Sequence, residues 1–483
     1  MGKHSSAPMQ SPAGRFQPPM PLPQAQPLGV FALVRTLRSN ALECWTKAHF
    51  EQAIVLGGFP FAQVAVVSDP RSVRQILVED QSTFRKSTIE RRVLSARLRN
   101  GLVSVDGDQW QRLRRTLAPM FARKTMAGFA PQIGGATEAL IERWQNLPEG
   151  TVIEIKTEML RYALEVLLRC IFAEGIGDPE AVRTATTRFY STCGTLDPFD
   201  VIGLPDFVPR LTRLREGPIM RAFDDELKKA IAERRRSLAV SPNATHDMLG
   251  AMLAARDPDT GASMTEAEVK DNVLTFIFGG QETTSSALTW AIYLLSQSPE
   301  WRERVIEESR RLADASWQTA VEGLVQTRAV VEEALRIYPP IIAITRTAIR
   351  DTEIAGNLIK RGTLVVVSPY VLHHHRLLWR DPDLFDPARF SPNASEKIER
   401  YSYLPFGVGP RMCVGAALSL QEATLALASI MRRFQLDLAP GQNVWPVQSN
   451  FTLRPRGGLH MILRRRGTSA RGSSRPTDIV ANK

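Results

Sequence analysis

The stretch Phe406-Gly407-Val408-Gly409-Pro410-Arg411-Met412-Cys413-Val414-Gly415 governs how the rest of this sequence is interpreted. It stands directly before an apolar, helix-forming run over residues 416–434. Free backbone N–H groups and the positive end of the dipole at a helix N-terminus favour a thiolate over a thiol. Glycines allow tight turns and the close approach of a flat group, and Arg411 adds a fixed cation. The stretch predicts either a glycine-rich turn around a buried cysteine or a thiolate that binds an anionic cofactor.

The composition is that of an ordinary globular protein, with 43% hydrophobic and 23% charged residues in a chain of 483. The four cysteines are scattered and form no CxxC pair, which favours a reducing compartment over a disulfide framework. The net charge is +11, but no nucleic-acid-binding module is recognisable. The longest apolar run, residues 273–295, is interrupted by six consecutive polar residues at 281–286, so no transmembrane anchor is predicted. We expect a cytoplasmic monomer that does not bind nucleic acid.

Helical patterns dominate the chain. Helices are predicted over residues 108–121, 154–172, 222–240, 266–297 and 321–337, and strand-like runs lie near 53–67, 341–349, 364–368 and 451–463. The fold class predicted is therefore mainly α with a small β region. Residues 1–27 are rich in proline and are expected to form a disordered lead-in, residues 28–466 a single domain, and residues 467–483 a flexible basic tail.

All five fixed positions of the pattern FxxGxRxCxG occur in the cysteine stretch, and by this pattern the chain resembles the cytochrome P450 superfamily. The resemblance covers about residues 40–464, and the length is closer to fatty-acid hydroxylases than to the short soluble bacterial type. It implies a single-domain P450 fold with haem b between the long helix and the helix after the cysteine. Cys413 would be the axial ligand of the haem iron, Phe406 would pack beside the sulfur, Gly415 would complete the cofactor-binding loop, and Arg411 would pair with a haem propionate.

The long helix predicted over residues 266–297 contains the segment Gly279-Gly280-Gln281-Glu282-Thr283-Thr284. Two glycines disfavour a helix interior by about 1 kcal/mol each, and the Thr283 hydroxyl can bond the Gly279 carbonyl four residues earlier. A solvated polar face is the alternative, but the segment is apolar on both sides. The segment resembles the oxygen-activation motif of the same family, which implies proton delivery by Glu282 and Thr283, with Gly279 and Gly280 lining the distal pocket.

Further along the chain, Glu333-Ala334-Leu335-Arg336 allows two interpretations. Spacing alone favours a surface pair between Glu332 and Arg336. The family's ExxR motif instead selects Glu333 and Arg336, joined by Arg389 of the segment Pro387-Ala388-Arg389-Phe390, as a structural triad. The resemblance also implies that Trp110, Arg114 and Arg346 bind haem propionates.

Two other clusters of polar residues allow a functional interpretation. Trp110 and Arg114 share a helix face, which places an indole N–H beside a guanidinium. Residues 373–375 are three consecutive histidines, but neighbouring residues converge poorly on one metal ion, and the family resemblance gives this run a place ahead of the Arg389 segment.

The resemblance implies a monooxygenase that inserts one atom of O2 into a hydrophobic substrate, possible classes being fatty acids, terpenoids and steroids. The electrons would come from NAD(P)H through a ferredoxin or flavodoxin with its reductase. The basic residues Arg112, Arg115, Arg123 and Lys124 form either the docking face for that partner or an ordinary solvated face. Two alternatives stay open: a haem-thiolate isomerase or dehydratase that does not activate O2, against which Glu282 and Thr283 argue, and a non-catalytic haem sensor.

Overall fold

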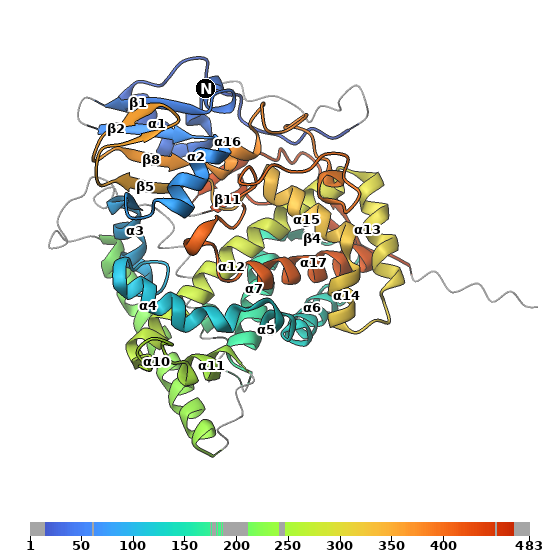
Figure 1. The fold of residues 1–483 in the computed structure, drawn as a ribbon. Helices are drawn as coiled ribbons and strands as arrows, with labels where there is room; N and C mark the ends of the chain where they lie inside the picture. The colour runs from blue at the N-terminus through green and yellow to red at the C-terminus, as the bar shows by residue number, and fades with distance from the viewer. Residues whose placement is uncertain are drawn as a thin grey trace, which may run out of the picture.

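The computed structural model describes residues 15–59, 62–173, 211–240, 247–449 and 452–467, together with residues 175, 180, 182–184 and 186. Within these ranges a large helical part lies beside a smaller sheet-rich part, and the whole forms a single, mainly α domain (Figure 1). The described α-helices are α1 (Val30–Ser39), α2 (Pro70–Arg74), α3 (Thr88–Leu98), α4 (Gly107–Leu117), α5 (Arg123–Ala127), α6 (Ala130–Gln145), α7 (Ile155–Ile171), α10 (Leu211–Val240), α11 (Met248–Ala254), α12 (Glu266–Ser296), α13 (Pro299–Arg311), α14 (Trp317–Gly323), α15 (Val325–Ile337), α16 (Pro369–His373) and α17 (Ala416–Arg433).

The strands join segments that are far apart in the sequence. The largest sheet has the order β1-β2-β8-β5-β3, in which only β2 and β8 run parallel. Its members are β1 (Ile54–Phe59), β2 (Ala62–Val67), β8 (Leu364–Val367), β5 (Ile344–Ala348) and β3 (Phe84–Lys86). The smaller sheets are β4 (Val152–Glu154) with β12 (His460–Arg465) and β9 (Phe434–Leu438), β10 (Pro446–Ser449) with β11 (Thr452–Pro455), and β6 (Thr352–Ile354) with β7 (Asn357–Ile359).

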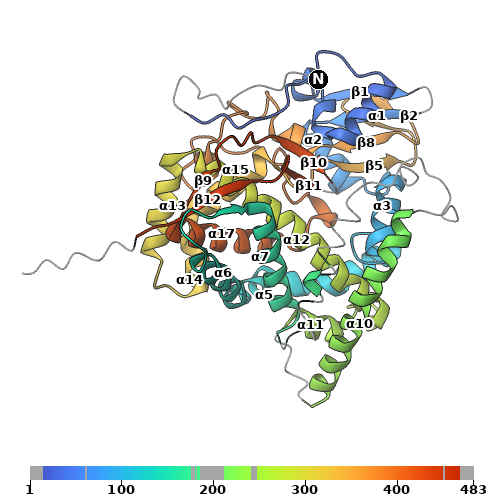
Figure 2. The same ribbon diagram turned by 180° about the vertical axis from the view of Figure 1, so that it is seen from behind.

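The helix α12 runs through the middle of the helical part and packs against α7, α15, α17 and β11 (Figures 1 and 2). The Thr265 hydroxyl accepts from the Glu268 N–H at 3.2 Å, and the Glu268 carboxylate accepts from the Thr265 N–H at 2.9 Å, which is the predicted capping box. Most of its residues are buried, as expected of a helix that crosses the core of a domain. In its central turns only Gly279, Gly280 and Thr283 retain accessible surface.

Two predicted helices are interrupted. The helix expected over residues 321–337 is divided into α14 and α15, because the buried Glu308 carboxylate of α13 accepts from the backbone N–H groups of Gln326 and Thr327 at 2.7 and 2.8 Å. A carboxylate satisfies the free N–H groups of a helix start, so α15 begins there. The helix expected over residues 108–121 ends at Leu117, and a 3₁₀ turn containing Pro119 follows it.

The prediction of a disordered lead-in over residues 1–27 is wrong for residues 15–27, which lie on the body of the protein. The Phe16 side chain is buried and its carbonyl accepts from the Phe385 N–H at 3.1 Å, while the Pro19 carbonyl accepts from the buried Tyr338 hydroxyl at 2.8 Å. Burial of the Phe16 side chain and hydrogen bonds to the two carbonyls stabilise the ordered conformation, although the proline-rich composition favours disorder. Residues 1–14 and residues 468–483, nearly all of the predicted tail, lie outside the described residues.

Candidate active site around Cys413

The loop before α17 holds its shape through its own backbone. The Cys413 N–H donates to the Phe406 carbonyl at 2.9 Å, which closes the loop. Gly407 and Gly409 have φ of +68° and +76°, a conformation that favours glycine. A Cβ at Gly409 would lie 2.3 Å from the Leu77 carbonyl oxygen, so this position also requires a residue without a side chain. The loop therefore presents Cys413 in a fixed orientation just before the helix.

The Cys413 side chain retains accessible surface. The protein around it still removes much of the water near the sulfur, and this desolvation raises the pKa of the thiol. The N–H of Gly415 and the charge of Arg114 act in the opposite direction. A cysteine just before a helix predicts a lowered pKa, and this prediction is wrong for Cys413 because desolvation of the thiolate outweighs both favourable contacts. Coordination of a metal cation displaces the proton of a thiol, so a site of this kind favours the thiolate only when the metal is bound.

Arginine side chains gather beside the loop. The Arg411 guanidinium lies over the Trp110 ring at 4.1 Å and forms an ion pair with Asp106, at the residue before α4. Arg346 on β5 is buried, and burial lowers its pKa while Asp106 acts to raise it. Sequence analysis placed the indole of Trp110 beside Arg114, whereas the guanidinium that covers the ring belongs to Arg411. It also missed Asp106, because nothing in the local sequence marks an aspartate 305 residues before Arg411 as its partner.

These residues fit an iron porphyrin with acidic side chains. The donor set is one accessible cysteine sulfur together with three partly or fully buried guanidinium groups, those of Arg114, Arg346 and Arg411. Burial is the largest cause that lowers the pKa of Arg411. The positive charges of Arg346 and Arg114 lower it further. A cluster of buried cations needs anionic partners, and in this chain Asp106 and Glu90 supply only part of that charge.

The middle of α12 is opened at one point. The Thr283 hydroxyl donates to the Gly279 carbonyl at 2.7 Å, as the spacing predicted. Nothing lies within 4 Å of the position where a Cβ at Gly279 would stand, so this glycine borders open space. Gly280 has a different role, since its Cβ position lies 3.1 Å from the Leu167 side chain of α7. Gly280 therefore allows α7 and α12 to pack closely, which differs from the expectation that both glycines line a pocket.

Glu282 is buried and its carboxylate is held by two other elements. Its Oε1 atom lies 3.2 Å from Nζ of Lys156, on α7, and accepts from the Thr452 hydroxyl of β11 at 2.7 Å. Sequence analysis placed Glu282 beside Thr283 as a proton donor but found neither of these partners. One signal was available: Lys156 falls on the apolar face of its helix with Met159, Ala163 and Val166, where a charged residue requires a partner.

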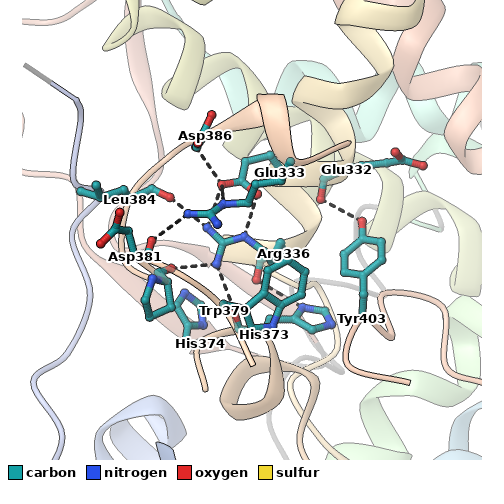
Figure 3. A network of polar contacts seen from close by, with 12 residues as sticks. Glu332, Glu333, Arg336, His373, His374, Trp379, Asp381, Leu384, Asp386 and Tyr403 are labelled. Carbon is teal, nitrogen blue, oxygen red and sulfur yellow. Dashed lines mark hydrogen bonds and ion pairs between the residues drawn. The ribbon is translucent and has the colours of Figure 1, made fainter. Parts of the chain in front are cut away.

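Glu333 and Arg336 form the centre of a buried polar network (Figure 3). The Arg336 Nε and Nη2 atoms donate to the two Glu333 oxygens at 2.6 and 2.7 Å, and both side chains are fully buried. Arg336 also donates to the carbonyls of His373, Pro382 and Leu384. Arg389 Nε lies 3.6 Å from Glu333 Oε1, while Glu332 pairs with Arg328. The structure thus brings together the three residues that the resemblance selected, and not the pair that spacing alone favoured.

The three histidines 373–375 are all buried, and each ring contacts backbone. His373 Nε2 accepts from the Leu404 N–H at 2.8 Å, which leaves Nδ1 to donate to the Arg336 carbonyl at 3.2 Å. His373 belongs to the network around Arg336, whereas the His374 and His375 rings contact the carbonyls of Tyr370 and Gln52. Across the residues that the structure describes, no group of three or more His, Cys, Asp or Glu side chains could hold a metal ion. Every described helix is also too short or too polar to span a lipid bilayer.

Comparison with known proteins agrees with this geometry. The sequence profile of the Cytochrome P450 family matches residues 30–462. The chain belongs to the cytochrome P450 family. It is a haem-binding oxidoreductase, and relatives of this cytochrome P450 are named as monooxygenases.

Cyclooctatin synthase of Streptomyces melanosporofaciens is 32% identical over 94% of the chain and 97% of that relative. Pentalenene oxygenase of Streptomyces avermitilis is 30% identical over 80% of the chain and 85% of that relative. Among solved structures, the haem domain of cytochrome P450DA has the same fold, with a TM-score of 0.78 over 93% of this chain and 98% of that one, at 24% identity.

Proposed function

We propose that this cytochrome P450 inserts one oxygen atom from O2 into a cyclic terpenoid. The similarity to cyclooctatin synthase along almost the whole of both chains carries the proposal, and the similarity to pentalenene oxygenase supports it. Terpenoids are one of the three substrate classes expected from the sequence. Fatty acids and steroids are the other two, and they serve as the comparison compounds in the test below.

In this proposal Cys413 binds the haem iron, Phe406 and Gly415 complete the loop around the sulfur, and Arg346, Arg411, Trp110 and Arg114 hold the propionates. A haem with a thiolate ligand supplies the cleavage of the O–O bond. Thr283, with the accessible backbone of Gly279 beside it, would orient oxygen and protons next to the bound haem. Glu282 supplies the protons. Glu333, Arg336 and Arg389 fix the segment that leads to the cysteine loop.

The electrons come from NAD(P)H through a separate ferredoxin or flavodoxin and its reductase. Two of the four basic residues first considered for docking are neutralised within the chain, because Arg112 pairs with Glu268 and Arg115 pairs with Asp257 and Asp259. Arg123 and Lys124 on α5 are exposed. We therefore place the acidic partner at α5, and expect the rate of electron transfer to fall as salt is raised.

The absorption spectrum of the reduced carbonyl adduct is recorded first, to test thiolate ligation of the haem. A binding screen then follows the haem spin state with pentalenene, dodecanoic acid and testosterone as probes. Pentalenene is expected to shift the spin state at the lowest concentration and to give an oxygenated product with NAD(P)H consumption. A shift by dodecanoic acid alone would reject the terpenoid proposal. Product formed without NAD(P)H consumption would favour an isomerase or dehydratase. Binding without turnover of any probe would favour a haem sensor. Cell fractionation would test the cytoplasmic location.

A further inference from the structure

Lys156 is a buried lysine. Among the described residues, its ammonium group forms its ion pair and its hydrogen bonds with the segment of α12 that carries Glu282 and Thr283. Nζ lies 3.2 Å from Glu282 Oε1 and donates to the Glu282 carbonyl at 3.2 Å and to the Ser285 hydroxyl at 2.9 Å. The Ser285 hydroxyl in turn donates to the Glu282 carbonyl at 2.9 Å. The lysine therefore binds both the side chain and the backbone of Glu282 in the turn of α12 that contains Thr283.

We propose that Lys156 is a positioning residue for proton delivery, which balances the charge of the buried Glu282 carboxylate and holds it in place so that it can take up one proton and pass it on toward Thr283. The inference rests on the proposed oxygen chemistry of Glu282. In each transfer the carboxylate gains one proton from the solvent side and releases one, while Lys156 remains an ammonium ion. The Thr452 hydroxyl, which donates to the same carboxylate oxygen, sets its orientation.

The charges around the pair support this role. Burial lowers the pKa of Lys156, and Glu282 is the largest influence that raises it again. Arg454 on β11 and Glu154 before α7 are the other charged groups that act on Lys156, with opposite signs. Glu154 is itself occupied by the backbone N–H groups of Lys156, Thr157 and Leu459. Glu282 is therefore the carboxylate that depends most directly on Lys156.

Removing the lysine leaves a buried carboxyl group without its cation, and burial favours the neutral acid. Such a group gives up its proton only at higher pH, so the pH range of proton delivery moves upward. The same change appears in folding. The folded Lys156→Met protein retains a proton that the unfolded chain loses above about pH 4.3, so its stability falls as pH rises.

The experiment compares the wild-type holoenzyme with Lys156→Met, Lys156→Arg, Glu282→Gln and the double variant Lys156→Met/Glu282→Gln. Urea unfolding between pH 5.5 and 8.5 should show the unfolding constant of Lys156→Met rising by up to about tenfold per pH unit relative to wild type. The double variant should lose this dependence, and Lys156→Arg should resemble wild type. With NAD(P)H and a reductase system, Lys156→Met should release several-fold more peroxide, with its pH midpoint above that of wild type.

Arg234→Met is the matched control, because it breaks another buried ion pair, with Asp247 at 3.0 Å, that is separate from the Lys156–Glu282 pair. It should weaken folding without changing the peroxide yield. The inference is overturned if Lys156→Met unfolds with the pH dependence of wild type, or if Glu282→Gln uncouples the enzyme while Lys156→Met does not. If Glu282→Gln itself remains fully coupled, the proposed role of Glu282 fails, and this inference with it.

Discussion

Thr283 is the residue of α12 to which the proposed function assigns the orientation of oxygen. It retains accessible surface in a helix that is otherwise buried, and its hydroxyl bonds the carbonyl of Gly279, beside open space. Thr289, six residues further on, bonds the Ser285 carbonyl in the same way at 2.6 Å but is fully buried. The two threonines make the same local contact in different surroundings.

We expect Thr283→Ala to keep haem and substrate binding but to divert electrons into peroxide, with product per electron lowered about tenfold or more, since a positioned proton relay contributes 10²–10⁴-fold. Peroxide and product would be measured together in a turnover assay. Thr289→Ala loses an equivalent hydroxyl and should remain coupled. Tight coupling in Thr283→Ala would contradict the assignment.

The buried histidines make folding sensitive to mild acid. Burial lowers the pKa of His374 to about 3 and holds that of His373 well below its ordinary value, while both histidines of the unfolded chain take up protons near pH 6.5. The unfolded state then binds more protons, so stability is lost as pH falls below about 6.5. Each histidine contributes up to about 1.4 kcal/mol per pH unit.

Urea unfolding between pH 6.5 and 5, above the range in which most carboxylates titrate, would measure this slope. His374→Leu should be less stable near neutral pH, because it loses the 2.8 Å contact with the Tyr370 carbonyl, but its stability should fall less steeply with acid. An equal slope in the variant and the wild type would show that His374 does not control the acid response.

At the scale of elements, the loop after α3 is clamped to two helices. Arg99 donates to both oxygens of Asp224 on α10, at 2.9 and 2.7 Å, and lies 3.8 Å from Asp271 on α12. The next residues lie directly on α12, because the Asn100 and Leu102 N–H groups donate to Asp271 and Asn272. A Cβ at residue 101 would lie 1.9 Å from the Thr275 hydroxyl oxygen, so only glycine fits there. The loop after α3 is thus joined to both α10 and α12 at this point.

We predict that Arg99→Ala lowers the free energy of local opening of this loop by about 1 kcal/mol. The effect is smaller than for a buried ion pair, because Arg99 is partly exposed to solvent. Hydrogen exchange at the amides of Asn100 and Leu102 should become about fivefold faster. Arg328→Ala, which breaks an exposed pair within α15, should leave these amides unchanged. Unchanged exchange in Arg99→Ala would mean that the backbone contacts with α12 hold the loop by themselves.

The positions of the main helices were largely predictable, because apolar periodicity and capping residues are local signals. The capping box of α12 is formed as expected. The division between α14 and α15 was not predictable, because the Glu308 carboxylate that caps α15 comes from another helix. The strand runs were found as well, but their pairing was not, since β2 and β8 are about 300 residues apart.

At the scale of the whole molecule, the network around Arg336 joins α15 to the chain that leads toward Cys413. Arg336→Ala would leave the Glu333 carboxylate buried without its main cation, at a cost of about 3–5 kcal/mol. We expect the variant to lose most of its stability and its haem, as measured by urea unfolding and by the haem content of purified protein. Arg328→Ala should cost less than about 1 kcal/mol. A stable Arg336→Ala protein with normal haem would disprove the structural role.

By itself the sequence determined the family and the helical class, because motifs and periodicity report contacts within a few residues. It also predicted Cys413 as the iron ligand and Thr283 as the residue on the oxygen side. Only the tertiary structure decided which charges meet: Asp106 with Arg411, Lys156 with Glu282, and Arg99 with Asp224. It also placed residues 15–27 on the body of the protein. These contacts join residues more than a hundred positions apart, so the choice of partner depends on how the elements pack, and no local pattern names it.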